Sequence, residues 1–179
     1  MAYSSTTKSA AEQAAQAADK VLFLARNVLK HCFPISDWKN ASGLDRNLTG
    51  YEADYAADGL ADIPTKPVVA SPAETVCDLL FNIDASINGS ANVADGIVIA
   101  GHNFHTLARA YATTLTVTAA IADDDAFTGG DYTELAQWSI TSGYRNPRLV
   151  SFDLASAAGR YTSVEWFRLR ISSPVAFSV

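Results

Sequence analysis

The sequence predicts a mainly β protein: an antiparallel jelly-roll-type β-sandwich with an Ala-rich N-terminal helical arm. Two observations lead to this fold class. Several segments after residue 73 alternate apolar and polar side chains, and no strong helical segment separates them. Such alternation is typical of half-buried antiparallel strands, whereas a parallel sheet needs crossover helices between its strands. We therefore expect an arm over residues 1–19 and a β-sandwich domain over residues 20–179.

The composition of the 179-residue chain excludes several classes of protein. The chain is 49% hydrophobic and 18% charged, which is not the composition of a disordered protein. Its net charge of −6 argues against binding to nucleic-acid phosphates, and two cysteines are too few for a disulfide scaffold. No apolar run approaches the roughly 20 residues of a bilayer span, and the first residues lack the pattern of a secretory signal. We expect a soluble, folded protein that binds neither nucleic acid nor membrane.

The first expected element is helical. Residues 10–18 are rich in Ala, which gives high helix propensity but few side chains able to anchor in a core. Larger apolar side chains then follow at helical spacing, and the direct prediction is a helix over about residues 8–30. The alternative is a shorter helix followed by a strand at residues 20–24, because short apolar runs do not distinguish the two.

Residues 31–73 carry little periodicity and predict a long irregular segment. Pro, Gly, Asp, Asn and Ser are frequent there, as they are in loops. An irregular stretch of this length is unusual inside a compact domain. We expect it to wrap the domain surface, held by the apolar side chains of Trp38, Leu44, Leu48, Tyr51 and Tyr55.

The strands are expected after residue 73. The candidates are residues 75–83, 96–100, 114–122, 149–154 and 164–171. The third and the last alternate most clearly between apolar and polar side chains. The second is apolar on both faces, which predicts a central strand of the sheet.

The last predicted strand separates two sets of side chains. Its apolar face, from Phe167 to Ile171, is the expected core face. The other face carries Trp166, Arg168 and Arg170, and we expect it to point outward or toward a partner. Aromatic rings beside arginines form sugar platforms and protein hot spots, although they can equally be core rings with arginines extended along the surface. The full set of candidate partner-binding residues is Trp38, Trp138, Tyr144, Arg145, Trp166, Arg168 and Arg170.

No motif in the sequence indicates a metal, a cofactor or a reaction. His102 and His105 could ligate a metal in a site completed by His31, Cys32 and Cys77. Those further ligands lie at distant positions, however, and no zinc spacing is present. The acidic loop 123–125 lacks the spacing of a calcium-binding hand, and a structural calcium there is a minority alternative. Nucleophile elbows, phosphate loops and dinucleotide fingerprints are also missing. We expect no enzyme activity, no cofactor and no metal, with His102 and Asn103 hydrogen-bonding the backbone of a strand-end turn.

An apolar strand, Gly96–Ala100, ends in the turn Gly101–Phe104 and is followed by the alternating run Leu115–Ala120. A second pattern, Tyr161–Ile171, lies near the carboxyl end. Together with two earlier segments, Val21–Asn27 and Asn47–Thr49, these short motifs resemble small virion proteins of tailed bacteriophages. The resemblance covers roughly residues 20–175 and favours the strand alternative at residues 20–25, while the Ala-rich arm departs from the pattern.

This resemblance implies a galactose-binding-like (discoidin-like) β-sandwich that serves as a tail, baseplate or capsid-surface component. The expected function is that of a structural protein of the bacteriophage particle, with the tail as first choice. Its expected partners are other virion proteins and copies of itself, and its expected location is the virion, after synthesis in the host cytoplasm. The alternatives are a carbohydrate-binding module for host or surface glycans and a capsid decoration protein.

Overall fold

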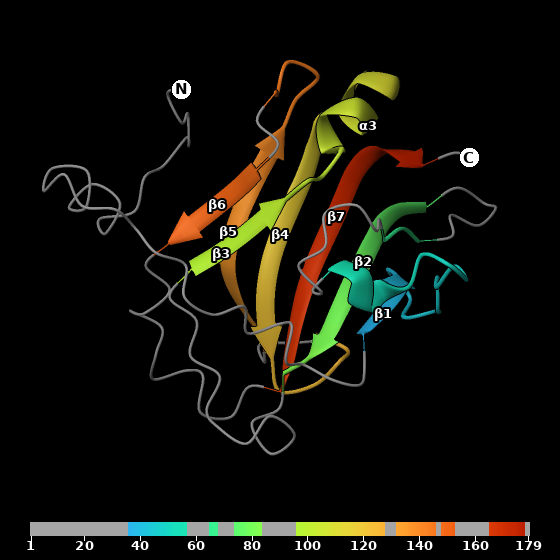
Figure 1. Ribbon diagram of the computed structural model, residues 1–179, viewed down its shortest axis with the longest axis vertical. Helices are drawn as coiled ribbons and strands as arrows, with labels where there is room; N and C mark the ends of the chain where they lie inside the picture. Colours follow the sequence, from blue (N-terminus) through green and yellow to red (C-terminus); the bar gives the residue numbers. More distant parts are fainter. Residues whose placement is uncertain are drawn as a thin grey trace, which may run out of the picture.

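The computed structural model of this protein describes residues 36–56, 65–67, 74–83, 96–127, 132–145, 148–152 and 165–177. Within these ranges the protein is mainly β, as the sequence predicts (Figure 1). The expected arm at residues 1–19, and the choice between helix and strand at residues 20–30, lie outside the described residues.

Five strands form the larger of two sheets, in the spatial order β1-β2-β7-β4-β5. The strands are β1 Ser36–Asn40, β2 Glu74–Asn82, β4 Leu115–Ala122, β5 Tyr132–Ile140 and β7 Trp166–Phe177. Every neighbouring pair is antiparallel, which confirms the arrangement expected from the alternating patterns. The central strand is β7, which pairs with β2 on one side and β4 on the other.

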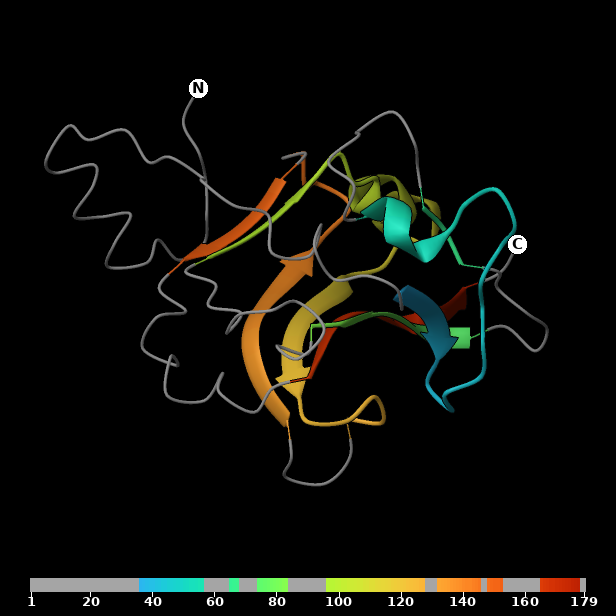
Figure 2. The same ribbon diagram turned by 60° about the horizontal axis from the view of Figure 1, so that its bottom comes forward.

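A second, two-stranded antiparallel sheet is made of β3 (Gly96–Ala100) and β6 (Arg148–Phe152). Figure 2 shows this pair on the same side of the large sheet as the helix α3 (Phe104–Ala110) and the 3-10 helix η2 (Ala53–Ala56). The large sheet therefore has one face covered by other elements of secondary structure, and we call this the inner face.

The prediction that residues 96–100 form a central strand was wrong. In the described part of the chain β3 pairs with β6 alone, and Val98 is 38% exposed. The apolar character of this strand has a different cause: Ile97 and Ile99 pack against the core, while Val98 points away from it.

Within the described ranges, four elements form where the sequence predicted none: β1, η2, α3 and β5. β1 lies inside the segment expected to be irregular, and it contributes a single large core side chain, Trp38. β5 carries Leu135, Ala136, Trp138 and Ile140 toward the core, but a bulge between its pairings with Ala119 and Ala120 interrupts the alternation. The seven-residue helix α3 is too short for a clear periodicity. No helix among the described residues is long and apolar enough to cross a membrane.

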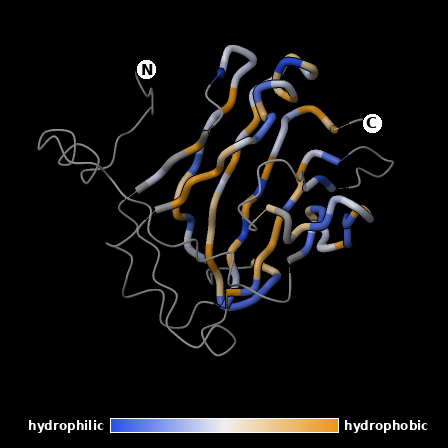
Figure 3. The backbone as a smooth tube through the Cα atoms, viewed as in Figure 1, coloured by the Kyte–Doolittle hydropathy of each residue, from blue (hydrophilic) through white to orange (hydrophobic). Residues whose placement is uncertain are grey.

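The main core lies on the inner face of the large sheet. Alternate residues of β2, β4 and β7 point into it, as the pleat of a strand requires. Figure 3 shows the apolar colour along these strands and the hydrophilic loop that follows β4. The largest of the fully buried side chains are Phe81, Leu80, Leu115, Ile140, Leu149 and Val117, all but Leu80 in this core.

The opposite, outer face of the large sheet carries a smaller apolar cluster. It consists of Leu80, Ala120, Ala122 and Phe127, with Trp166 packed against it. The cluster is at the end of the sheet where β4 finishes and the loop 123–127 begins. The remainder of the outer face is polar and charged, and the candidate site lies there.

Candidate functional site: a charged groove on the outer face of the sheet

Strand β7 places the candidate site, because its side chains alternate between the two faces of the large sheet. Phe167, Leu169 and Ile171 are buried in the main core, which confirms the predicted core face. Arg168 and Arg170 therefore both lie on the outer face, two residues apart on the same strand. The sheet register aligns Arg170 with Asp78 of β2.

Asp78 and Arg170 form a two-pronged ion pair across β2 and β7. Arg170 donates from Nε to Oδ1 and from Nη2 to Oδ2 of Asp78, both at 2.7 Å. The Asp78 side chain is 7% exposed and that of Arg170 is 33% exposed, so the pair is largely shielded from water. The hydrogen bonds to Asp78 raise the pKa of Arg170, because they stabilise the charged guanidinium. Both charges of this pair are thus committed to each other.

Arg168 lies on the outer face, as the alternation predicts, but its side chain is buried there. The residue is only 4% exposed, and its Nε is fully buried without a hydrogen-bond partner. Its guanidinium carbon lies 4.2 Å from the centre of the Phe127 ring and 5.3 Å from that of Tyr132. Burial, and then the nearby charge of Arg170, lower the pKa of Arg168. The aromatic faces stabilise this cation, but they are weaker partners than a carboxylate.

The loop after β4 places one of these rings over Arg168. Asp124 Oδ1 accepts hydrogen bonds from the backbone N–H groups of Ala126 and Phe127, each at 2.9 Å. Phe127 has a φ of 52°, a left-handed conformation that costs a residue with a side chain about 1–2 kcal/mol. The Asp124 turn and the burial of the Phe127 ring together hold this conformation.

The turn after β1 forms the opposite wall of the site. Asn40 Oδ1 accepts from the N–H groups of Ser42 at 2.9 Å and Leu44 at 3.0 Å. Asn40 in turn donates from Nδ2 to Glu74 at 2.7 Å, and Arg46 also binds the Glu74 carboxylate. The hydrogen bond from Arg46 lowers the pKa of Glu74, so this carboxylate stays charged and holds the turn.

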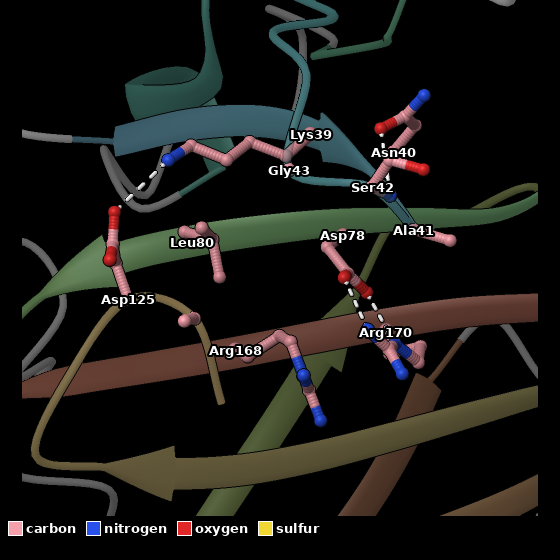
Figure 4. A pocket seen from close by; sticks show the side chains of 11 residues that line it. Lys39, Asn40, Ala41, Ser42, Gly43, Asp78, Leu80, Asp125, Arg168 and Arg170 are labelled. Carbon is pink, nitrogen blue, oxygen red and sulfur yellow. Dashed lines mark hydrogen bonds and ion pairs between the residues drawn. The ribbon is translucent and has the colours of Figure 1, made fainter. Parts of the chain in front are cut away.

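Between these walls lies a groove of about 370 Å³. Figure 4 shows two ion pairs in it, Lys39 with Asp125 and Asp78 with Arg170, and Arg168 between them. The Lys39 Nζ to Asp125 Oδ2 distance is 3.1 Å. The described residues that line it are Lys39, Asn40, Ala41, Ser42, Gly43, Asp78, Leu80, Asp125, Ala126, Arg168 and Arg170. We refer to this space as the outer-face groove.

Only two of the seven candidate partner-binding residues, Arg168 and Arg170, line this groove. Trp166 is half-buried against the small outer-face cluster. Arg145 is exposed in the turn after β5, where Nη1 donates to the carbonyl of Ser142 at 3.2 Å. The seven residues therefore do not form one surface.

The aromatic residues Trp38, Trp138 and Tyr144 belong to the inner face. Trp38 is 4% exposed and donates from Nε1 to Thr65 Oγ1 at 2.7 Å, so its expected role as an anchor of the segment holds and its indole is not open to a partner. Trp138 and Tyr144 are partly buried against the main core. Burial raises the pKa of Tyr144.

His102 and Asn103 follow β3 as expected, but their side chains do not hydrogen-bond the turn. Both ring nitrogens of His102 are buried without a partner, and Asn103 makes no side-chain cap to α3. The turn is instead held by the backbone of Asn103, because its carbonyl accepts a hydrogen bond from the N–H of Thr106 at 2.8 Å. His102 instead stacks on Phe104 with 4.6 Å between the ring centres, and Tyr144 lies 6.2 Å away.

His31 and Cys32 lie outside the described residues, and in the part of the chain that the structure describes His102 and His105 do not assemble a metal centre with Cys77. Among the described residues, no group of three or more His, Cys, Asp or Glu side chains could hold a metal ion. Cys77 lies on β2 in the main core, and burial raises the pKa of its thiol to about 11. Such a thiol is a poor ligand and a poor nucleophile at neutral pH.

Comparisons of the chain with protein families, with curated proteins and with solved structures found no match. The class that the fold and the site define is a mainly antiparallel β protein with a charged groove on the outer face of its main sheet.

Proposed function

We propose that the chain is a structural component of a bacteriophage particle, placed in the tail, and that it acts through contacts with other virion proteins and with copies of itself. The resemblance of residues 20–175 to small virion proteins supports this proposal. The observation that carries it furthest is that no other described strand pairs with the edges of the small sheet.

In the described part of the chain, β3 and β6 pair only with each other, so each has a free edge. A free edge presents unpaired N–H and C=O groups that can pair with a strand of another chain. Val98, in the middle of β3, is 38% exposed and adds an apolar side chain to this surface. A free strand edge therefore favours pairing with a strand of another protein.

The finer points of the expected architecture belong to the same proposal. A jelly-roll-type sandwich is supported by the path of the chain, which passes between the two sheets from β2 to β3, β3 to β4, β5 to β6 and β6 to β7. We propose that residues 1–19 form a helical arm that docks on a neighbouring subunit, because their Ala-rich sequence favours a helix that needs a partner to be stable.

Sedimentation of the full chain tests the assembly surface. We expect concentration-dependent oligomers, and we expect Val98→Lys to shift them at least tenfold in concentration because the lysine places a charge in the contact. The matched control is Val175→Lys, since Val175 is also exposed but lies near the end of β7 in the other sheet. Equal sedimentation of the wild type and Val98→Lys would remove β3 from the proposed surface.

Mass spectrometry of purified virions tests the location. The chain should be present in intact particles, and immunogold labelling should place it on the tail. Labelling of the capsid shell would instead favour a capsid decoration protein. Absence of the chain from intact virions would end the structural proposal.

A second candidate function, a carbohydrate-binding module for host or surface glycans, is favoured by one observation. The outer-face groove has the volume of a small-ligand pocket and a lining of charged and hydrogen-bonding side chains. A glycan array with the full chain tests this function. Binding of at least one glycan supports it, and no binding across diverse bacterial polysaccharides contradicts it.

A further inference from the structure

The charged side chains of the outer-face groove do not balance. Lys39 pairs with Asp125, and Arg170 pairs with Asp78. The fifth charged residue of the lining, Arg168, makes no ion pair with any residue that the structure describes. Among the described residues of the lining, the positive charges therefore exceed the negative charges by one, and the unpaired charge is on the most deeply buried cation.

The neighbouring carboxylates do not supply the missing charge. Asp78 uses both of its oxygens on Arg170. Glu134 is exposed on β5 and makes no ion pair with Arg168 within the described ranges. What surrounds the Arg168 guanidinium is the ring of Phe127 at 4.2 Å and that of Tyr132 at 5.3 Å.

Arg168 is held in place rather than folded back onto a carboxylate. Its Nε is buried without an acceptor, and the ring above it belongs to a residue with a φ of 52°. A buried, unpaired cation is costly unless a ligand neutralises it. Arrangements that destabilise the folded protein in this way are typical of binding sites.

We propose that the outer-face groove binds the carboxylate of an acidic sugar, a uronic acid, and that Arg168 recognises this carboxylate. A guanidinium presents its N–H groups in a planar fork that matches a carboxylate. The single unpaired charge of Arg168 matches a ligand with one anionic group. The inference rests on the second candidate function, glycan binding, and names the class of glycan.

The remainder of the groove suits the hydroxyl groups of a sugar ring. Ser42 contributes a hydroxyl, Lys39 has donors beyond the one bound to Asp125, and Asp125 uses a single carboxylate oxygen on Lys39. The volume of about 370 Å³ is near the lower end for small-ligand pockets. One sugar unit fits this space better than a segment of folded protein.

Titration calorimetry of the full chain with D-glucuronate, and with D-glucose as the uncharged counterpart, tests the inference. We expect saturable binding of glucuronate and none of glucose at the same concentrations. Arg168→Met should weaken glucuronate binding at least tenfold, because it removes the charge while keeping a long apolar side chain. Arg145→Met is the matched control, since Arg145 is exposed outside the groove, and its affinity for glucuronate should equal that of the wild type.

Replacing the buried Arg168 could disturb the structure around it, so a second variant changes an exposed residue of the groove instead. Ser42 is an exposed residue of the turn that lines the groove, so Ser42→Trp should fill the groove without touching the core. We expect it also to weaken glucuronate binding at least tenfold. Equal affinity for glucuronate in the wild type, Arg168→Met and Ser42→Trp would overturn the proposal.

The array and the calorimetry separate two kinds of failure. If the chain binds neutral glycans but not glucuronate, glycan binding stands and the uronate proposal fails. If the chain binds no sugar at all, both fail.

Discussion

Acidification should destabilise this protein through His102, because the folded chain resists protonation of that imidazole. Burial, and then the neighbouring His105, lower the pKa of His102 from 6.5 to about 4. Its ring stacks on Phe104, and both of its nitrogens lack a hydrogen-bond partner. Protonation would place a charge in this stack with no group to accept its two protons.

The sign and size of the effect follow from the two pKa values. Because the folded-state pKa lies below the unfolded value, the unfolded chain binds the proton first as the pH falls. Stability is therefore full above about pH 6.5 and is lost progressively toward about pH 4. Between about pH 7.5 and pH 5 the unscreened loss is about 2 kcal/mol, and solvent screening of a half-buried ring reduces it to about 1 kcal/mol.

Urea unfolding at these two pH values measures the loss, with His102→Phe as the comparison. The phenylalanine keeps an aromatic ring against Phe104 but cannot titrate, so the pH dependence that remains in this variant comes from the other titratable groups of the chain. We expect the wild type to lose about 1 kcal/mol more than His102→Phe on acidification. Equal losses in the two proteins would show that the folded state protonates His102 freely and would refute the reasoning.

Three further expectations concern stability at neutral pH. Asp78→Asn should lower the free energy of unfolding in urea by about 3 kcal/mol, because it leaves the Arg170 guanidinium without its buried carboxylate. Lys39→Met, at the more exposed pair, should lower it by less than about 1 kcal/mol. Similar losses in the two variants would contradict this ranking. Leu115→Ala should lower the free energy of unfolding by about 3 kcal/mol, since Leu115 is 0% exposed, and a cost under about 1 kcal/mol would show that the core there is not packed as described. Ala112 has a φ of 48° just after α3, so Ala112→Gly should stabilise the protein by about 1 kcal/mol. Ala110→Gly, inside the helix, should destabilise it by a similar amount. A loss of stability in Ala112→Gly would contradict the left-handed conformation of this residue.

The parts of the fold that follow from a period of two could be predicted from the sequence. The alternation from Phe167 to Ile171 assigned the core face of β7 correctly, because a strand fixes the direction of each side chain. The same rule failed for residues 96–100, since an apolar run looks alike in a central strand and in a two-stranded sheet that packs against a core. Trp38 shows a related difficulty, because one tryptophan among polar residues does not distinguish a strand from a loop anchor.

The site was harder to predict, because it depends on pairings between strands far apart in the sequence. Arg168 and Arg170 were recognised as one face of a strand, but which of them is paired depends on the register of β2. Asp78 lies between Cys77 and Leu79, so the sequence predicts that its side chain points to the outer face. The sequence does not predict that its partner is Arg170, because this pairing depends on the register between β2 and β7. Phe127 gives no local signal, since its role depends on where the loop after β4 returns to the sheet.

The central claim is that Arg168 is a buried, unpaired cation that binds an anionic ligand. The NMR signal of its Nε–H group tests this claim most directly. Arg168→Met identifies the signal, and the exposed Arg145 supplies the reference. The buried, unpartnered Nε predicts slower exchange of this proton with water than for Arg145, and a shift of the signal when glucuronate is added. Exchange as fast as that of Arg145, with no response to glucuronate, would contradict the account.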